Sequence, residues 1–353
     1  MDNDYTATRH KIYTKKIREM LKGFPPYCAD YFRARESTTS VLTRFEYATD
    51  LRIFFNFLIN RLPRFLNKNI ESITLSDLDS ITSTEIEIFI EYLSYYERNG
   101  EEFVNNESTK ARKLSTIRAF FKYFYKKGQL LSTVPTFVDP PKLHDKPIVR
   151  LEPDEVARLL DACETGLGMT MHQKKLHEKA KIRDMAILTL FLGTGIRISE
   201  LVGLNTDDLN FFSNEFSITR KGGNKDTLVF GSETRTALLN YIEIRESQNP
   251  LPGYEGALFL SSQMKRLTVR AVENIVKKYA AVAVPQKSIS PHKLRSTYGT
   301  MLYRETGDIY LVADCLGHKD VNTTKKHYAA LSQDRRRFAA SVIKLRDDDE
   351  KKD

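Results

Sequence analysis

The sequence lacks any long hydrophobic run, and this absence excludes the classes of protein that need one. Its longest apolar stretches, residues 186–195 and 279–284, are much shorter than the roughly 20 residues of a transmembrane helix. The N-terminus also lacks the apolar segment of a secretory signal peptide. Basic side chains interrupt it instead, at Arg9, Lys11, Lys15 and Lys16. We therefore expect a cytosolic protein.

Cysteine is scarce, and its placement excludes two further architectures. The chain has 3 cysteines, Cys28, Cys163 and Cys315, which are odd in number and widely separated, so neither a disulfide framework nor a zinc site is expected. His172 and His177 are five positions apart and do not share a helix face, which argues against a metal site there. Glycine-rich nucleotide loops are absent as well. The sequence predicts that no metal, ATP or other cofactor is used.

Acidic residues are missing from one long stretch of an otherwise mixed chain. The 353 residues carry a net charge of +9, with 41% hydrophobic and 29% charged residues, which suits two soluble globular domains. Residues 108–128 contain seven basic side chains and no acid. Such a field attracts polyanions, and nucleic acid leads that group. Residues 347–353, in contrast, form a largely acidic tail.

The same basic stretch has the periodicity of an amphipathic helix over residues 108–127. Leu114, Ile117, Phe121 and Phe124 fall on one face and are expected to be core. The opposite face is cationic and is predicted to contact DNA phosphates, with an ordinary solvated face as the alternative. The residues predicted to bind DNA, here and in the second half of the chain, are Lys110, Arg112, Arg118, Lys122, Lys225 and Lys293.

Helical patterns dominate the rest of the chain. A hairpin is expected from strands 214–220 and 226–230, and residues 164–181 are expected to form a long basic loop containing at most a helical turn. Residues 130–153 are proline-rich and have few apolar anchors, which is typical of an interdomain linker. Helices are expected at residues 38–62, 84–98, 108–127, 152–162, 184–192, 196–204, 233–246, 268–283, 291–304, 309–316 and 333–345.

The second half offers the groups that cut a phosphodiester without a metal. This reaction needs cations to hold the phosphate, a nucleophile, a proton acceptor and a proton donor for the departing oxygen. Each candidate alone has an ordinary structural explanation, and only their order and spacing together indicate this chemistry. The set comprises Arg197 after a glycine turn, Lys221 on the hairpin tip, His292 and Arg295 one helical turn apart, His318 after a glycine, and Tyr328.

These motifs resemble the signature boxes of the tyrosine recombinases, also called the phage integrase family. The matching segments are 194–201, 292–297 and 316–319 through His327-Tyr328. The resemblance implies a mainly α protein that clamps DNA in a C shape: a helical core-binding (SAM-like) domain, and an α+β catalytic domain with a small antiparallel β-hairpin sheet. The expected parts are a basic extension (1–23), the core-binding domain (24–134), a linker (135–150), the catalytic domain (151–331) and a C-terminal helix and tail (332–353).

The resemblance also assigns roles to residues. Arg197 and Arg295 would hold the non-bridging oxygens, and His318 would add a hydrogen bond to the phosphate. His292 would accept or steer the proton of Tyr328, which would carry the 3′ phosphate. Lys221 would protonate the leaving 5′ oxygen, although the extra residue in its hairpin leaves Lys225 as an alternative. Glu200 is expected either to pair with an active-site cation or to lie exposed on its helix.

Three functions remain open on the sequence alone. The first is a site-specific recombinase that acts as a tetramer on inverted-repeat DNA, with the C-terminal helix docking on the next subunit. The lack of room for an arm-binding domain before Phe24 makes it most similar to the Xer resolvases of chromosome dimers, with phage or transposon integrases as the alternative and an accessory protein left open. The others are a type IB topoisomerase and a non-catalytic DNA-binding protein.

Overall fold

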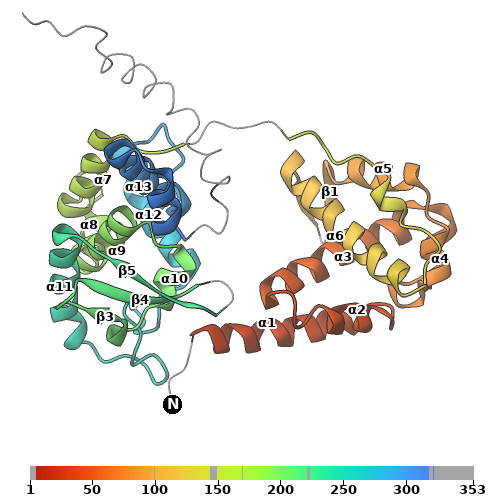
Figure 1. Ribbon diagram of the computed structural model, residues 1–353, viewed down its shortest axis with the longest axis horizontal. Coiled ribbons are helices and arrows are strands. Elements are labelled where there is room, and N and C mark those ends of the chain that lie inside the picture. Colours follow the sequence, from red (N-terminus) through yellow and green to blue (C-terminus); the bar gives the residue numbers. More distant parts are fainter. Residues whose placement is uncertain are drawn as a thin grey trace, which may run out of the picture. The chain divides into compact units, whose positions relative to one another are not determined.

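The computed structural model describes residues 5–98, 100–143, 149–168, 170–220, 223–317 and 321. The chain divides into two compact units, one formed by Asp4–Lys146 and the other containing Pro147–Asp353; both are drawn in Figure 1. Within the described ranges, no helix is both long and apolar enough to cross a membrane.

The N-terminal unit is a bundle of helices around an aromatic core. Helix α3 is buried along much of its length and packs against α1 and α6. Phe54 of α3 meets Phe89 of α5 edge-on, with ring centroids 5.1 Å apart, the geometry that aromatic quadrupoles favour. The helices are α1 (Tyr5–Leu21), α2 (Cys28–Ala34), α3 (Val41–Arg61), α4 (Leu75–Asp79), α5 (Ser83–Tyr92) and α6 (Glu107–Lys126).

The core-facing residues predicted for α6 are confirmed. Leu114, Ile117, Phe121 and Phe124 are each at most 1% exposed. The helix begins at the N-cap Asn106, whose side chain accepts a hydrogen bond from the Thr109 backbone N–H at 2.9 Å, a contact that satisfies one of the free N–H groups of the first turn.

The helix expected at residues 84–98 is wrong over its last part. Helix α5 ends at Tyr92, and the chain continues into strands β1 (Tyr95–Arg98) and β2 (Glu101–Val104), which pair with Arg98 opposite Glu101. The sequence Asn99-Gly100 favours a tight two-residue hairpin turn. Gly100 has a φ of +76°, which is accessible to glycine at little cost.

Part of the segment predicted as a linker packs onto the N-terminal unit. Leu130 and Val138 are 3% and 4% exposed and belong to its core. Arg118 donates hydrogen bonds to the carbonyl oxygens of Pro135, at 2.9 Å, and of Val138. These contacts fasten residues 134–138 to α6, so an extended strap can begin only beyond Val138.

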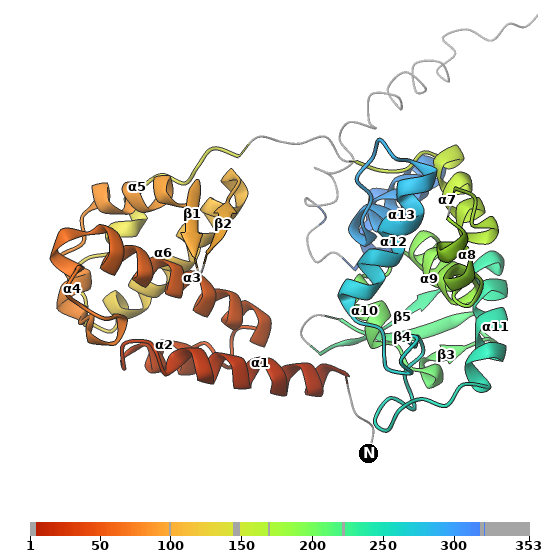
Figure 2. The same cartoon turned by 180° about the vertical axis from the view of Figure 1, so that it is seen from behind.

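The C-terminal unit is built around α9, which is buried over most of its length and packs against α7, α11 and α13. A three-stranded antiparallel sheet of order β3-β4-β5 lies beside α11, as seen in Figures 1 and 2. The sheet confirms the predicted hairpin. The elements are α7 (Pro153–Thr165), α8 (Met171–Glu178), α9 (Lys181–Thr194), α10 (Ile198–Gly203), β3 (Leu209–Asn210), β4 (Glu215–Thr219), β5 (Lys225–Val229), α11 (Ser232–Glu246), α12 (Val269–Ala283), α13 (Pro291–Thr306) and α14 (Ile309–Cys315).

Residues 164–181 are more ordered than the predicted loop, because they contain the two-turn helix α8. His177 is only 2% exposed, and its Nδ1 lies 3.1 Å from the Tyr279 hydroxyl, which donates to the Asp184 carboxylate at 2.8 Å. Burial, reinforced by the nearby charge of Lys278, lowers the pKa of His177 below its usual 6.5. A neutral His177 therefore anchors α8 to α9 and α12. The helix predicted at residues 333–345 lies outside the described residues.

Candidate active site and nucleic-acid interface

The turn between α9 and α10 requires glycine and places Arg197 at the start of α10. Gly195 ends α9 with a φ of +61°, and a Cβ added there would lie 2.5 Å from Tyr298 Cδ1 and 2.9 Å from Leu316 Cδ2. No other residue type fits this conformation and this close approach without a shift of its neighbours. Two residues later, Arg197 is the N-cap of α10.

Arg197 and Arg295 converge on one carbonyl oxygen at the end of α14. Arg197 Nη2 donates to the carbonyl oxygens of Leu316 and Gly317, at 3.1 and 3.0 Å. Arg295, which is 5% exposed, donates to the same Leu316 oxygen and to the Gly195 carbonyl oxygen. Two permanently charged guanidinium groups that share one neutral carbonyl ligand form a positive centre that suits an anion such as phosphate.

Glu200 holds Arg197 in this position. Its Oε2 accepts the backbone N–H of Arg197 at 3.0 Å, and its Oε1 accepts Arg197 Nη1, also at 3.0 Å. The Glu200 side chain is only 3% exposed. Of the two alternatives that the sequence offered for Glu200, the structure therefore confirms pairing with Arg197 and contradicts an exposed helical side chain.

His292 lies in the first turn of α13, three residues before Arg295. The helix begins with Pro291 at its first position, which is compatible with the unpaired N–H groups of a helix start. His292 is exposed, whereas Lys293 is half-buried. An exposed imidazole beside a helix N-terminus is accessible to an anionic substrate.

The six predicted catalytic residues are placed only in part. The structure brings Arg197 and Arg295 together and puts His292 on the same helix as Arg295, whereas Lys221, His318 and Tyr328 lie outside the described residues. The alternative proton donor, Lys225, is the first residue of β5, opposite Thr219, and is exposed.

Arg220 is a site residue that the sequence analysis missed. Its guanidinium Nη1 lies 3.5 Å from Glu200 Oε1, and the side chain is 11% exposed. A usable signal existed in the alternation of β4. Phe216 and Ile218 are buried, and the two-residue period of a strand puts Arg220 on their side of the hairpin. A charged residue on a buried face calls for a partner or a function.

At three positions, the side chains of the cationic strip predicted on α6 pair with groups that lie outside residues 108–128. Lys110 is 9% exposed and pairs with Glu107 at 2.9 Å. Arg112 pairs with the fully buried Asp50 of α3, at 2.6 Å. Arg118 donates hydrogen bonds to the carbonyl oxygens of residues 135 and 138. Residues 108–128 contain no acid, but acidic side chains from outside this range lie next to them in the fold.

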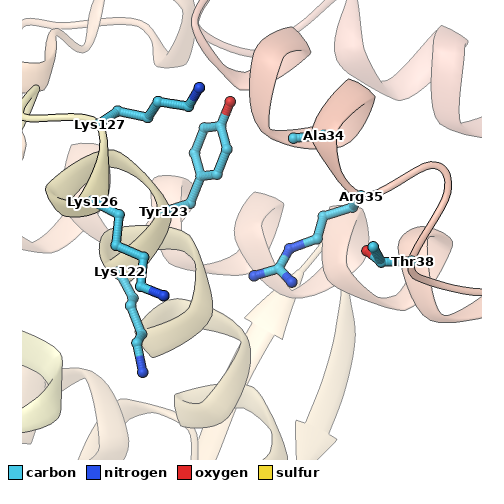
Figure 3. A pocket seen from close by; sticks show the side chains of 7 residues that line it. All are labelled: Ala34, Arg35, Thr38, Lys122, Tyr123, Lys126 and Lys127. Carbon is cyan, nitrogen blue, oxygen red and sulfur yellow. The ribbon is translucent and has the colours of Figure 1, made fainter.

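Lys122 belongs instead to a cationic hollow between α2 and α6, shown in Figure 3. The hollow has a volume of about 530 Å³. Arg35, just after α2, points across it toward α6, and its cation lies 5.4 Å from the Tyr31 ring centroid. We call this feature the α2–α6 pocket; it is lined by Ala34, Arg35, Thr38, Lys122, Tyr123, Lys126 and Lys127.

No carboxylate lines the α2–α6 pocket, and Lys122, Lys126 and Lys127 are all exposed. No acidic side chain within the described residues forms a salt bridge to any of the three. Four cations around one hollow repel one another until an anion enters. The pocket is thus a better candidate for phosphate contact than the N-terminal part of α6.

Two family models match this chain. Residues 149–335 match the phage integrase family, and residues 27–128 match the phage integrase N-terminal SAM-like domain. The first match alone covers more than half of the chain.

Curated relatives carry a consistent name. The chain is 33% identical over 285 residues to tyrosine recombinase XerC of Caldanaerobacter subterraneus subsp. tengcongensis, covering 79% of this chain and 75% of the relative. It is 27% identical over 352 residues to tyrosine recombinase XerS of Lactococcus lactis subsp. cremoris, covering 93% of this chain and 98% of the relative.

Solved structures share the fold. One is the XerH site-specific recombinase bound to a palindromic difH substrate, with a TM-score of 0.65, 18% identity, and coverage of 86% of this chain and 80% of that chain. Another is the Tn1549 transposon integrase in complex with circular intermediate DNA, with a TM-score of 0.64, 18% identity, and coverage of 94% and 98%. Both similarities concern the mainly helical fold with its small antiparallel sheets.

Proposed function

Because this chain belongs to the phage integrase family, we propose that it is a site-specific recombinase that cuts and rejoins DNA through a 3′-phosphotyrosyl intermediate. The observation that carries the proposal is the convergence of Arg197 and Arg295 on the Leu316 carbonyl oxygen, with Glu200 bracing Arg197. This arrangement supports the binding of a phosphate rather than a neutral substrate.

In the proposed cleavage step, the Tyr328 oxygen attacks the scissile phosphorus while the bond from phosphorus to the 5′ oxygen breaks. His292 accepts or steers the tyrosine proton, Lys221 donates a proton to the 5′ oxygen, and His318 supplies a further hydrogen bond to the phosphate. Arg197 and Arg295 neutralise the charge that builds on the non-bridging oxygens. A free tyrosine has a pKa of about 10, so nearby cations are needed to favour its anion at neutral pH.

The rejoining step reverses these bonds with a different partner. The phosphotyrosyl ester retains the energy of the broken bond, so a 5′ hydroxyl from another duplex can attack it without ATP. We propose duplex DNA with an inverted-repeat site as the substrate and the cytosol as the site of action. Chromosome dimer resolution is the favoured role, because the match to the XerS relative extends over 352 residues and 98% of that protein.

The reaction class is tested with two differently labelled DNA duplexes that carry the same candidate site. A recombinase exchanges the labelled flanks between the duplexes. A topoisomerase would relax a supercoiled plasmid without exchanging flanks, and a non-catalytic binding protein would do neither. Flank exchange is the expected result, and relaxation alone would contradict the proposal.

We propose that the α2–α6 pocket binds backbone phosphates of the same DNA. Replacing Lys122, Lys126 and Lys127 with alanine should weaken DNA binding. It should also lower the slope of log affinity against log salt by about 0.9 for each phosphate that the variant no longer neutralises. The measurement is a salt titration of DNA binding by fluorescence anisotropy.

The matched control removes three cations of the same unit that already pair with acids. Lys22, Arg33 and Lys68 lie 2.8, 2.8 and 2.6 Å from Glu19, Asp30 and Asp77. Their triple alanine variant loses the same formal charge and should keep the wild-type salt slope more closely. Equal slopes for both triple variants would show that only net charge matters and would exclude a phosphate site in the pocket.

We also propose that four subunits assemble on two duplexes through the C-terminal segment. Residues Phe338, Ala339, Val342 and Ile343 have the spacing of an apolar helix face, although they lie outside the described residues. Deleting residues 333–353 should leave binding to a single site largely intact and abolish the pairing of two sites in a gel-shift assay. Recombination by the truncated protein at the wild-type rate would contradict this docking.

A further inference from the structure

Arg220 is a cation at the candidate site that the proposed reaction does not use, and its side chain is only 11% exposed. Its Nε donates to Asp226 Oδ2 at 2.7 Å, and its Nη1 lies 3.5 Å from Glu200 Oε1. The same Glu200 oxygen accepts Arg197 Nη1 at 3.0 Å. One carboxylate oxygen therefore links the hairpin of β4 and β5 to the arginine at the start of α10.

The guanidinium of Arg220 also lies against Gly317. A Cβ added at Gly317 would be 2.6 Å from Arg220 Cζ and 2.8 Å from its Nη2, and Gly317 has a φ of +57°. The Gly317 carbonyl oxygen accepts Arg197 Nη2 at 3.0 Å. Arg220 and Arg197 thus contact the same residue after α14, so a shift of either guanidinium disturbs the other.

The backbone of Arg220 closes the hairpin tip. Its N–H donates to the Asn224 carbonyl oxygen at 2.8 Å, and its carbonyl oxygen accepts the Gly223 N–H at 3.0 Å. The next residue in the sequence is Lys221, the proposed proton donor. Whatever fixes Arg220 therefore fixes the point from which the chain bearing Lys221 departs.

One nitrogen of the Arg220 guanidinium has no partner within the described part of the chain. Its Nη2 is buried and has no hydrogen-bond partner among the residues that the structure describes. A buried donor without a partner is destabilising, so its presence calls for an explanation, of which a functional role is one. The position of this nitrogen therefore indicates that Arg220 has a role beyond that of an ordinary surface side chain.

We propose that Arg220 is a positioning residue that holds the hairpin carrying the proton donor in register with Arg197, through their shared contact with Glu200 and with Gly317. The inference rests on the proposed function, since it concerns the cleavage step of that reaction. Arg220 acts on the leaving oxygen through Lys221, and the phosphate oxygens remain with Arg197 and Arg295.

A substrate with sulfur in place of the bridging 5′ oxygen tests this role. A thiol has a pKa near 8.5, far below that of an alcohol, so the sulfur leaves without receiving a proton. On ordinary DNA, Arg220→Ala should cleave about 30- to 100-fold more slowly than the wild type, because misplaced general acids lose rates of this order. On the sulfur substrate, Arg220→Ala and Lys221→Ala should both cleave within about threefold of the wild type.

Other results would overturn the inference. If sulfur fails to restore cleavage by Arg220→Ala, the residue does not act on the leaving group. If a neutral methylphosphonate restores it instead, Arg220 is a third phosphate-binding cation. If Arg220→Ala cleaves ordinary DNA at the wild-type rate, Arg220 is not needed to position the hairpin. Lys225→Ala, run in parallel, distinguishes the two lysines: if it is slow on ordinary DNA and restored by sulfur while Lys221→Ala is not, Lys225 is the proton donor and the role of Arg220 through Lys221 is wrong.

A folding defect would not hide the answer. Arg220→Lys keeps the positive charge but loses the planar guanidinium group. Its cleavage of ordinary DNA should be slowed less than that of Arg220→Ala, and the sulfur substrate should restore the rate. Asp226→Asn leaves Arg220 in place and removes only the negative charge of its partner on β5, whose side chain is 45% exposed, so it should behave in the same way. A wild-type protein that forms no covalent adduct would contradict the proposed function itself, whereas a normal wild type with an unaffected Arg220→Ala would contradict only the inference.

Discussion

Replacing Tyr328 with phenylalanine is expected to abolish the covalent protein–DNA adduct completely while DNA binding stays at the wild-type level. The substitution removes a single oxygen, which is the atom proposed to bond to phosphorus, and leaves an aromatic ring of nearly the same volume. A nicked substrate, from which the cleaved fragment diffuses away, traps the adduct for detection on a denaturing gel. Binding is measured separately on intact DNA.

The matched control for this experiment is Tyr310→Phe. Tyr310 lies on α14, near the end of the described chain, and is 71% exposed. Loss of its hydroxyl should leave both adduct formation and binding unchanged. An adduct that survives Tyr328→Phe would identify another nucleophile, and loss of binding in that variant would indicate a structural role for the hydroxyl.

Arg197→Ala is expected to slow cleavage about 100- to 1,000-fold, which is the usual effect of removing one donor that stabilises charge in a transition state. The loss should be mainly in the rate at saturating DNA, since the rest of the protein still binds the duplex. A methylphosphonate at the scissile position carries no negative charge on its non-bridging atoms. With less charge to neutralise, the defect of Arg197→Ala should shrink at least about tenfold on that substrate.

Arg270→Ala is the control for the loss of one guanidinium. Arg270 lies on α12, its side chain is 82% exposed, and it pairs only loosely with Glu273 at 3.4 Å. Its removal should affect neither substrate. If Arg197→Ala cleaves ordinary DNA at the wild-type rate, the convergence of Arg197 and Arg295 has no catalytic meaning and the reaction proposed here is wrong.

The sequence predicted what local periodicity and motif order control. The hairpin of β4 and β5 and the core face of α6 are confirmed, as are helices close to the expected bounds at α7, α9 and α12. Gly195 is understandable in the same way, since a glycine between two helical patterns marks a turn. For Arg197 and Arg295, motif spacing indicated a common site, and their shared contact with the Leu316 carbonyl agrees with it. For Glu200 the sequence left two alternatives, and its contact with Arg197 decides between them.

The sequence did not reveal the contacts that form where distant segments meet. Asp50 is far from α6 in the sequence, yet it accepts hydrogen bonds from Arg112, Lys113 and Thr116. Nothing within residues 108–128 reveals that a carboxylate from α3 binds the basic side chains in the first half of this segment. The burial of His177 has the same origin, because its partner Tyr279 lies 102 residues away. Local patterns report which face of a helix is apolar, and not which helix will cover it.

Arg197 and Arg295 of the candidate site both donate to uncharged main-chain oxygen atoms, which orient the two guanidinium groups before any substrate is bound. Arg295 donates to two main-chain carbonyls, and Arg197 shares its carboxylate partner with Arg220. Main-chain ligands fix the direction of a guanidinium without cancelling its charge. In the proposed reaction, a scissile phosphate therefore meets two guanidinium groups whose directions are already set; Glu200 offsets part of the charge of Arg197, while the carbonyl oxygen of Leu316 orients both arginines without offsetting any.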